Sequence, residues 1–220
     1  MNRILMRRKV LFLFVTLILF TAPRLFSAAT RDEGIIAEAP LSEYAGSKSC
    51  AECHKERYET WAKRLKANFV RYLKDIEDPL PFKWEKSPIK KHRVFIVVGK
   101  ERKFAFVDKK WTVLPYEFRL NKGRWVKRKG WAKNRFDYRV RCAPCHTTGS
   151  NPKRKNFKEL NVGCEACHGP SKTHNISESI KDITVPGRGG EDPLAQCRRC
   201  HNSRKNHARA LEDFNGTFHK

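Results

Sequence analysis

Residues 164–168 read CEACH, and the same pattern, C-x-x-C-H, recurs three more times along the chain. The other copies are CAECH at 50–54, CAPCH at 142–146 and CRRCH at 197–201. This pattern is the attachment signature of a c-type haem, in which the thiols bond covalently to the porphyrin and the histidine ligates the iron. The four copies use all eight cysteines of the 220-residue chain. The sequence therefore predicts four covalently attached haem c groups.

We name the copies motifs 1 to 4 in chain order, and each supplies two attachment cysteines and one proximal iron ligand. The predicted attachment residues are Cys50, Cys53, Cys142, Cys145, Cys164, Cys167, Cys197 and Cys200. The predicted proximal ligands are His54, His146, His168 and His201.

Zinc binding and disulfide bonding are the alternative uses of these cysteines. The spacing of Cys142 and Cys145 from Cys164 and Cys167 suits a four-cysteine zinc ribbon. An even number of cysteines in an exported chain also suits a disulfide framework. Neither alternative explains why a histidine directly follows the second cysteine of every pair, so haem attachment is the better interpretation.

The first 29 residues have the pattern of a secretory signal peptide. Basic residues within 3–9 precede an apolar run at 10–22 that is too short to span a bilayer. Small residues at 27–29 offer a cleavage site near Ala29. Because c-type haems are attached after export, the signal and the motifs support each other and predict a periplasmic protein. An uncleaved membrane anchor is the alternative, although Arg24 would interrupt the span.

Cleavage would leave 191 residues, or about 48 for each haem. A chain this short and polar would bury little core of its own, so the haems must supply much of it. We expect one domain, 30–220, with a mainly α-helical and irregular fold built around a four-haem cluster.

Two regions show regular patterns. Residues 55–75 have apolar side chains at helical spacing and predict one helix, which the prolines at 79 and 81 follow. Residues 92–127 instead predict a small antiparallel β-insertion with turns between short strands. The expected strands are 94–98, 104–107, 111–114 and 124–126, with turns at Gly99, Asp108 and Asn121-Lys122-Gly123.

The formal net charge is +24, of which the signal segment supplies five charges. Eight ionised haem propionates would lower the remaining +19 to about +11. A basic surface of this size often indicates nucleic acid, but export and haem attachment argue against it and no nucleic-acid motif is present. The expected partners are redox proteins with an acidic docking face, an anionic membrane surface or an anionic small molecule. A merely solubilising charge is the alternative.

Each iron needs a second axial ligand or is left open on one side. The only methionines, Met1 and Met6, lie in the signal segment, so His/Met ligation is excluded for the mature chain. The candidates are His174, His92 and His207, with His219 a weaker one. His174 and His207 each follow a motif histidine by six residues. This is at most about 20 Å of extended chain, so we expect them to reach a neighbouring haem.

The segments around the motifs resemble the tetrahaem cytochrome c-554 family, which is related to the multihaem hydroxylamine-oxidoreductase group. The matching stretches are GSKSC at 46–50 onward to Trp61, CAPCHTTG at 142–149 and VGCEACHGPSKTH at 162–174, with weaker similarity at 97–99 and 114–115. The resemblance implies a compact haem cluster with electron transfer as its role. It also places His174 on the family's distal histidine.

One position departs from that family. Where it has a histidine that ligates another haem, this chain has Lys66, within WAKRLKA at 61–67. Lysine ligates iron only as a neutral amine, which requires a buried setting. Ligation by Lys66, an open iron, and replacement by another histidine all remain possible.

These observations favour an electron carrier, not an enzyme, that passes electrons between a donor and an acceptor in the periplasm. The second interpretation is an oxidoreductase that acts on a small nitrogen or sulfur species at one open haem. A third is an accessory haem subunit whose basic face a partner covers.

Overall fold

The computed structural model describes residues 39–130, 137–190, 192 and 194–201. All of them belong to the compact unit Gly34–Lys220. The predicted signal peptide and His207 lie outside the described residues, so both stay predictions. In the part of the chain that is described, no helix is both long and apolar enough to cross a membrane.

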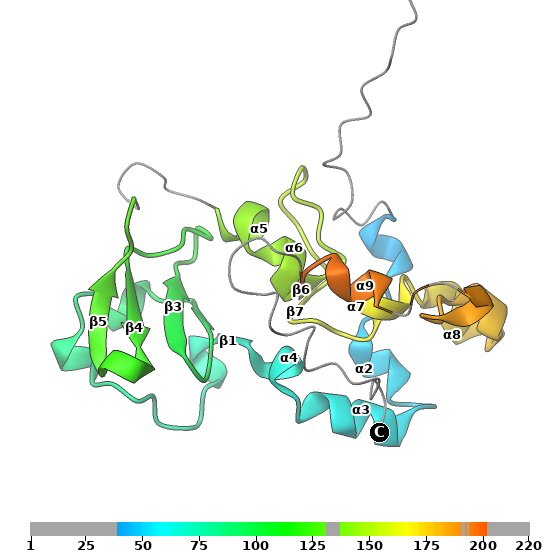
Figure 1. The fold of residues 1–220 in the computed structure, drawn as a ribbon, viewed down its shortest axis with the longest axis horizontal. Coiled ribbons are helices and arrows are strands. Elements are labelled where there is room, and N and C mark those ends of the chain that lie inside the picture. Colours follow the sequence, from blue (N-terminus) through cyan, green and yellow to red (C-terminus); the bar gives the residue numbers. More distant parts are fainter. Residues whose placement is uncertain (1–38, 131–136, 191, 193, 202–220) are drawn as a thin grey trace, which may run out of the picture. The chain divides into compact units, whose positions relative to one another are not determined.

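Short helices and two antiparallel sheets make up the described chain (Figure 1). The α-helices are α2 (Ser47–Cys50), α3 (Lys55–Ala62), α4 (Leu65–Asn68), α5 (Tyr138–Arg141), α6 (Ala143–His146), α7 (Glu165–His168), α8 (Lys172–Ser177) and α9 (Ala195–Arg198). Single 3-10 turns are η2 (Leu41–Glu43), η3 (Leu73–Asp75), η4 (Trp84–Lys86), η5 (Lys91–Arg93), η6 (Leu120–Lys122), η7 (Ile180–Asp182) and η8 (Arg188–Gly190). The strands are β1 (Val70–Tyr72), β2 (Ile96–Val98), β3 (Lys103–Val107), β4 (Tyr116–Arg119), β5 (Arg124–Lys127), β6 (Thr147–Thr148) and β7 (Glu159–Leu160).

The prediction of one helix over 55–75 is wrong. Helix α3 ends at Ala62, Arg64 is extended with ψ 152°, and the chain becomes strand β1 at Val70. The side-chain amide of Asn68 donates to the Ala62 carbonyl at 2.5 Å, and so satisfies one of the free carbonyls at the end of α3. Pairing of Val70 with Val98 of β2 then outweighs the helical spacing of the apolar residues.

The predicted antiparallel β-insertion is confirmed, although its strand boundaries differ. A five-stranded sheet has the order β1-β2-β3-β4-β5, and every neighbouring pair is antiparallel. The predicted strand at 111–114 is replaced by isolated bridges, Val107 with Val113 and Thr112 with Asp137. Strand β4, which was not predicted, instead pairs with both β3 and β5. Its buried Glu117 breaks the apolar pattern that sequence reasoning uses to find a strand.

The sheet buries side chains on both of its faces, which explains its nearly continuous apolar sequence. On one face, Val97, Phe104 and Phe106 belong to an aromatic cluster that includes Phe82 and Trp125. On the other face, residues of β1, β2 and β3 pack with the start of motif 2. The buried members of this second cluster are Val70, Ile96, Val107, Val113, Tyr138 and Ala143. The sheet is therefore the support of motif 2.

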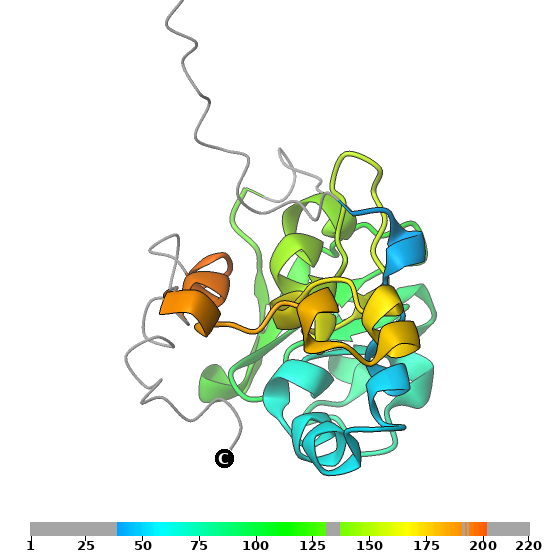
Figure 2. The same ribbon diagram turned by 90° about the vertical axis from the view of Figure 1, so that its right-hand side faces the viewer.

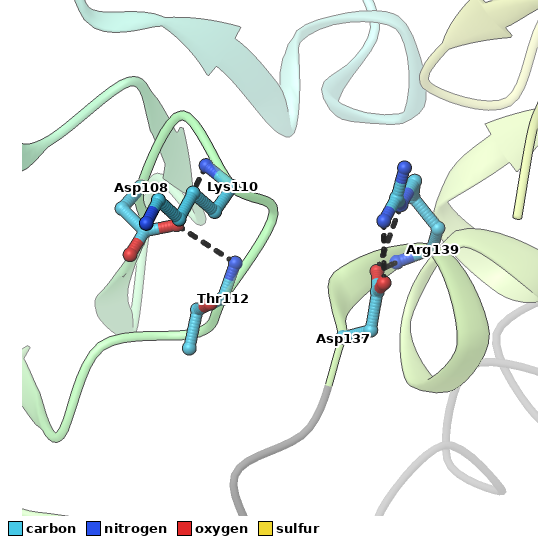
Figure 3. Close-up of polar contacts among 5 residues, drawn as sticks. All are labelled: Asp108, Lys110, Thr112, Asp137 and Arg139. Carbon is cyan, nitrogen blue, oxygen red and sulfur yellow. Dashed lines mark hydrogen bonds and ion pairs between the residues drawn. The ribbon is translucent and has the colours of Figure 1, made fainter.

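Two aspartates shape the turn that follows β3 and the start of α5 (Figure 3). Asp108 Oδ1 accepts the backbone N–H groups of Lys110 and Thr112, each at 2.9 Å. Asp137 caps α5 by accepting the Arg139 N–H at 2.9 Å and also binds its guanidinium at 2.6 Å. Partial burial opposes ionisation, but the bonds from Arg139 prevail and lower the pKa of Asp137. Asp137 thus starts the short helix that leads into motif 2.

Asn161 connects strand β1 to motif 2. Its side chain accepts the Val70 N–H at 2.6 Å and donates to the Val70 carbonyl at 2.8 Å. Its backbone N–H donates to the carbonyl of His146 at 2.9 Å, and its carbonyl accepts the Thr148 hydroxyl at 3.0 Å. Asn161 is buried, and its φ of 71° lies in the left-handed region that asparagine tolerates better than most residues.

Asn161→Ala is expected to lower the free energy of unfolding by about 2–4 kcal/mol, because it leaves buried Val70 groups unpaired and adds left-handed strain. Denaturant unfolding measures this loss. Asn161→Gly is the matched control: it removes the same bonds without the strain and should recover about 1 kcal/mol relative to alanine. A loss below 1 kcal/mol in both variants would contradict this role for Asn161.

Candidate functional site

Each C-x-x-C-H motif forms one helical turn. In all four, the histidine N–H donates to the carbonyl of the first cysteine, at distances between 2.8 and 3.1 Å. This i to i−4 bond places the two thiols and the imidazole on neighbouring positions of a single turn. The same local geometry therefore arises four times from the same local sequence.

None of the eight cysteines forms a disulfide bond, and two of the close cysteine pairs join different motifs. Cys50 of motif 1 is hydrogen-bonded to Cys164 of motif 3, which lowers the pKa of Cys164 to about 7. Cys200 of motif 4 is hydrogen-bonded to Cys145 of motif 2, which likewise lowers the pKa of Cys145 to about 7. A zinc ribbon would instead need the cysteines of motifs 2 and 3 to gather around one ion. Among the described residues, no group of three or more His, Cys, Asp or Glu side chains is placed to hold a metal ion.

Motifs 3 and 4 are also neighbours. Burial is the main cause that raises the pKa of Cys197, and the charge of Cys167 raises it further. Motif 3 also contacts the segment that follows motif 2, because the Gly163 N–H donates to the Thr148 hydroxyl at 2.8 Å. Cys200 Sγ of motif 4 lies 4.0 Å from the Pro144 carbonyl of motif 2. Motif 3 is therefore a neighbour of motif 2 as well as of motifs 1 and 4.

His54 and His174 face each other across a gap of the size that one metal ion needs. Their ring centroids are 6.5 Å apart and their planes are within 6° of parallel. Metal–nitrogen bonds of about 2 Å on each side, together with the half-widths of two imidazoles, give about 6 Å between ring centres. Directly packed rings would be closer, at about 3.5–4 Å between atoms. The ring separation of the pair is thus the one that two imidazoles bound to a single iron would have.

The second ring nitrogen of two histidines is held by a backbone carbonyl. His174 Nδ1 lies 2.9 Å from the Ser179 carbonyl, and His168 Nδ1 lies 2.9 Å from the Thr184 carbonyl. A carbonyl only accepts, so each Nδ1 carries the proton and each Nε2 keeps a lone pair for iron. The loop at 179–184 therefore prepares both imidazoles as ligands.

Motif 2 is closely packed against the rest of the protein. The ring of Phe69 lies parallel to that of His146, with centroids 4.9 Å apart, and Ala143 is fully buried. Burial raises the pKa of Cys142 to about 11, although the nearby charges of Arg128 and Lys103 oppose this rise. These two cations also surround the buried carboxylate of Glu117 in β4. The sheet thus supplies both packing and positive charge beside this motif.

The remaining candidate ligands do not share one setting. His92 lies exposed on η5, in the connection between β1 and β2, and its role as a distal ligand stays a prediction. His207 and His219 lie outside the described residues. His201 lies within motif 4, where its N–H closes the helical turn at 2.8 Å.

Lys66 lies exposed on α4, and its position is tied to motif 3. The Lys66 carbonyl accepts the Val162 N–H at 3.1 Å, and Trp61 Nε1 donates to the Val162 carbonyl at 2.9 Å. Burial raises the pKa of the Cys167 and Cys197 thiols, and the Lys66 ammonium opposes that rise at both. The charge of the amine therefore acts on thiols of both motif 3 and motif 4.

Several residues of the site escaped sequence reasoning. Glu165, between the cysteines of motif 3, is buried, and Ser47 forms a partly buried polar contact with Glu159. The only sequence signal for Glu165 was the acidic residue inside CEACH, which is ambiguous because motif 1 contains an exposed glutamate, Glu52. Gly163, directly before motif 3, was a further signal in the sequence. A side chain would not fit there, because an added Cβ would lie 2.0 Å from Glu159 Oε1 and 2.2 Å from Ser47 Oγ.

The residues present fit covalently bound haem. Cysteine pairs outside any disulfide, helical motif turns and an imidazole held through Nδ1 by a carbonyl are what its attachment and ligation require. The separation of His54 from His174 is an independent observation on the same point.

Comparison with known proteins agrees with this fit. The family model described as "Cytochrome c554 and c-prime" matches residues 49–93 and 116–169, which include motifs 1, 2 and 3. No curated protein sequence matches the chain.

Two solved structures share the fold. One is an undecahaem cytochrome from the S-layer of Carboxydothermus ferrireducens, with 25% identity and a TM-score of 0.59 over 75% of this chain. The other is the outer cell wall cytochrome OcwA, with 23% identity and a TM-score of 0.60 over 72% of this chain. The matches cover 26% and 37% of those proteins, so this chain spans about a quarter to a third of their length.

The fold and the motifs are similar to those of multihaem c-type cytochromes, the class that carries covalent haem c. Within that class the chain is cytochrome c-554-like, and the resemblance found in its sequence is confirmed.

Proposed function

We propose that this chain is an exported tetrahaem cytochrome that transfers electrons between redox partners in the periplasm. The observation that best supports the proposal is the clustering of the four motifs. The Cys164 N–H of motif 3 donates to Ser47 Oγ on the helix that begins motif 1, and the Gly163 N–H donates to Thr148 Oγ1 just after motif 2. Cys200 of motif 4 lies beside Pro144 of motif 2. Bound haem supplies reversible one-electron chemistry, and the protein's part is to hold, space and ligate it.

The protein residues have distinct parts in this proposal. The eight motif cysteines fix the porphyrins, and the four motif histidines give each iron its proximal ligand. His174 supplies the second ligand opposite His54, across motifs 1 and 3. His92 and His207 remain proposed distal ligands for other irons. With imidazole in place of methionine, the haem potentials are expected to lie mainly below those of His/Met cytochromes.

Partners and location are argued from charge and from the N-terminal segment. The excess of basic residues suits an acidic docking face on a redox protein, and the field would speed the encounter at low salt. An anionic membrane surface or a small anion is the other use of this charge. The apolar run at 10–22 supports export. The S-layer setting named for the undecahaem cytochrome is compatible with it.

Haem content is the direct test of this proposal. The mature protein is expected to have the mass of its polypeptide plus four haems, and the haem should resist extraction by acidified acetone. Cys197→Ala combined with Cys200→Ala should lose one haem mass and retain three. A protein with extractable haem, or with zinc in place of iron, would refute the assignment.

A second candidate function rests on Lys66. The chain has a lysine where the family places a ligating histidine, and the charge of that lysine acts on thiols of motifs 3 and 4. If the iron that faces it is open, the protein could bind a small nitrogen or sulfur species there, and the ammonium could hold an anion. An enzyme with an open iron would show a high-spin ferric signal, whereas a carrier with two ligands on every iron would be low-spin. Substitutions of Lys66 provide the test.

A further inference from the structure

Glu165, inside motif 3, is a buried carboxylate held by four hydrogen bonds. The residue is 2% exposed. Its Oε1 accepts the Ala45 N–H, the Ser171 N–H and the Ser171 hydroxyl, each at 2.8 Å, and its Oε2 accepts the Gly46 N–H at 2.8 Å. A buried charge without partners is costly, whereas these bonds satisfy both oxygens. The carboxylate is thus a fixed point within α7.

The four donors lie on the two segments that lead to the facing imidazoles. Ala45 and Gly46 directly precede α2, which begins motif 1 and leads to His54. Ser171 directly precedes α8, the helix of His174. One side chain therefore connects both segments to the same motif turn. Figure 2 shows the yellow segment with α7 and α8 beside the blue segment with α2.

A second contact joins these two helices without Glu165. Asn175 Nδ2 on α8 donates to Ser49 Oγ on α2 at 2.9 Å. This bond is exposed and involves neutral groups, so it contributes less than a buried carboxylate with four donors. Glu165 is accordingly the stronger of the two connections.

We propose that Glu165 is the positioning residue of the His54–His174 pair and that it sets the gap in which the two imidazoles take one iron. The inference rests on the proposed ligation by that pair and assigns a role to a side chain outside the C-x-x-C-H signature. Glu165 lies between the attachment cysteines of one haem and acts on the axial ligands of another.

Glutamine is the most informative substitution for Glu165. An amide has the same shape but only one acceptor oxygen. If that oxygen takes the Oε1 position, the three bonds to Ala45 and Ser171 persist, and the amide NH₂ then faces the Gly46 N–H as donor against donor. Glu165→Gln thus breaks the connection to the segment before motif 1 while it leaves the packing in place.

Electron paramagnetic resonance of the oxidised holoprotein, with mass measurement of haem content, tests this. Glu165→Gln should keep every haem but lose or broaden one low-spin signal, with the midpoint potential of that haem shifted. Ser171→Ala, which removes one donor, should produce a smaller change in the same signal. The matched control is Glu52→Gln, which removes an exposed carboxylate from motif 1 and should shift a potential without any change of ligation.

The outcomes separate the positioning role from the ligation itself. If His174→Ala changes no spin state, the axial pair is wrong and the positioning role fails with it. If His174→Ala frees one iron while Glu165→Gln and Ser171→Ala both match Glu52→Gln, only the positioning role is overturned. If Glu165→Gln does not mature, Ser171→Ala decides alone, and an unchanged signal refutes the proposal.

Discussion

His174→Ala is expected to turn one low-spin haem of the protein into a high-spin haem while all haems stay attached. The reason is geometric: His174 faces His54 at 6.5 Å with parallel rings, and its Nδ1 is occupied by the Ser179 carbonyl. Loss of the imidazole leaves that iron with one axial ligand, able to bind carbon monoxide or cyanide. The freed haem should also rise in potential, because it loses a strong donor ligand.

Electron paramagnetic resonance and carbon monoxide binding measure this change, each as one haem equivalent. Lys172→Ala is the matched control, since it changes an exposed residue on the same short helix. His92→Ala is the parallel test of the other described candidate. An unchanged low-spin spectrum in His174→Ala would remove the proposed axial pair, whereas a high-spin haem in His92→Ala would establish His92 as a ligand.

Lys66→His is expected to remove a high-spin ferric signal that the unmodified protein shows. Lys66 stands at the family's ligand position, and a lysine ligates iron only as a neutral amine, which is the minor form of an ordinary lysine at neutral pH. We therefore expect an open iron beside motif 3 or motif 4. Histidine at this position, pinned to Val162 through the backbone, should close that site and abolish the binding of nitric oxide or cyanide.

Lys66→Ala distinguishes the alternatives. With an open iron it should leave the spin state unchanged, whereas ligation by Lys66 would make the variant high-spin and the unmodified protein low-spin. Lys63→Ala, an exposed lysine at the end of α3, controls for the loss of charge. Four low-spin haems in the unmodified protein and in both Lys66 variants would mean that another histidine ligates this iron. The electron-carrier function alone would then stand.

Local sequence was a good guide wherever the structure is local. The C-x-x-C-H turn depends on five consecutive residues, so its four copies could be recognised one by one. The antiparallel sheet could also be predicted, because most residues of β2 and β3 are apolar, whichever face of the sheet they lie on. Sequence reasoning failed at 55–75, where helical spacing continues through Tyr72 but the chain turns into a strand. The partners that decide this, Val98 and Asn161, are distant in the sequence.

The sequence by itself predicted the chemistry of this protein: haem attachment, the proximal histidines and a mature chain without methionine ligands. Only the tertiary structure decided which motifs are neighbours, that His174 faces His54, and that Glu165 connects both segments. The physical reason is that a covalent motif needs only its own residues. A ligand pair, by contrast, depends on hydrogen bonds that bridge more than a hundred residues, such as that from Gly46 to Glu165. No local pattern records such bonds, because their donors are backbone groups that every residue possesses.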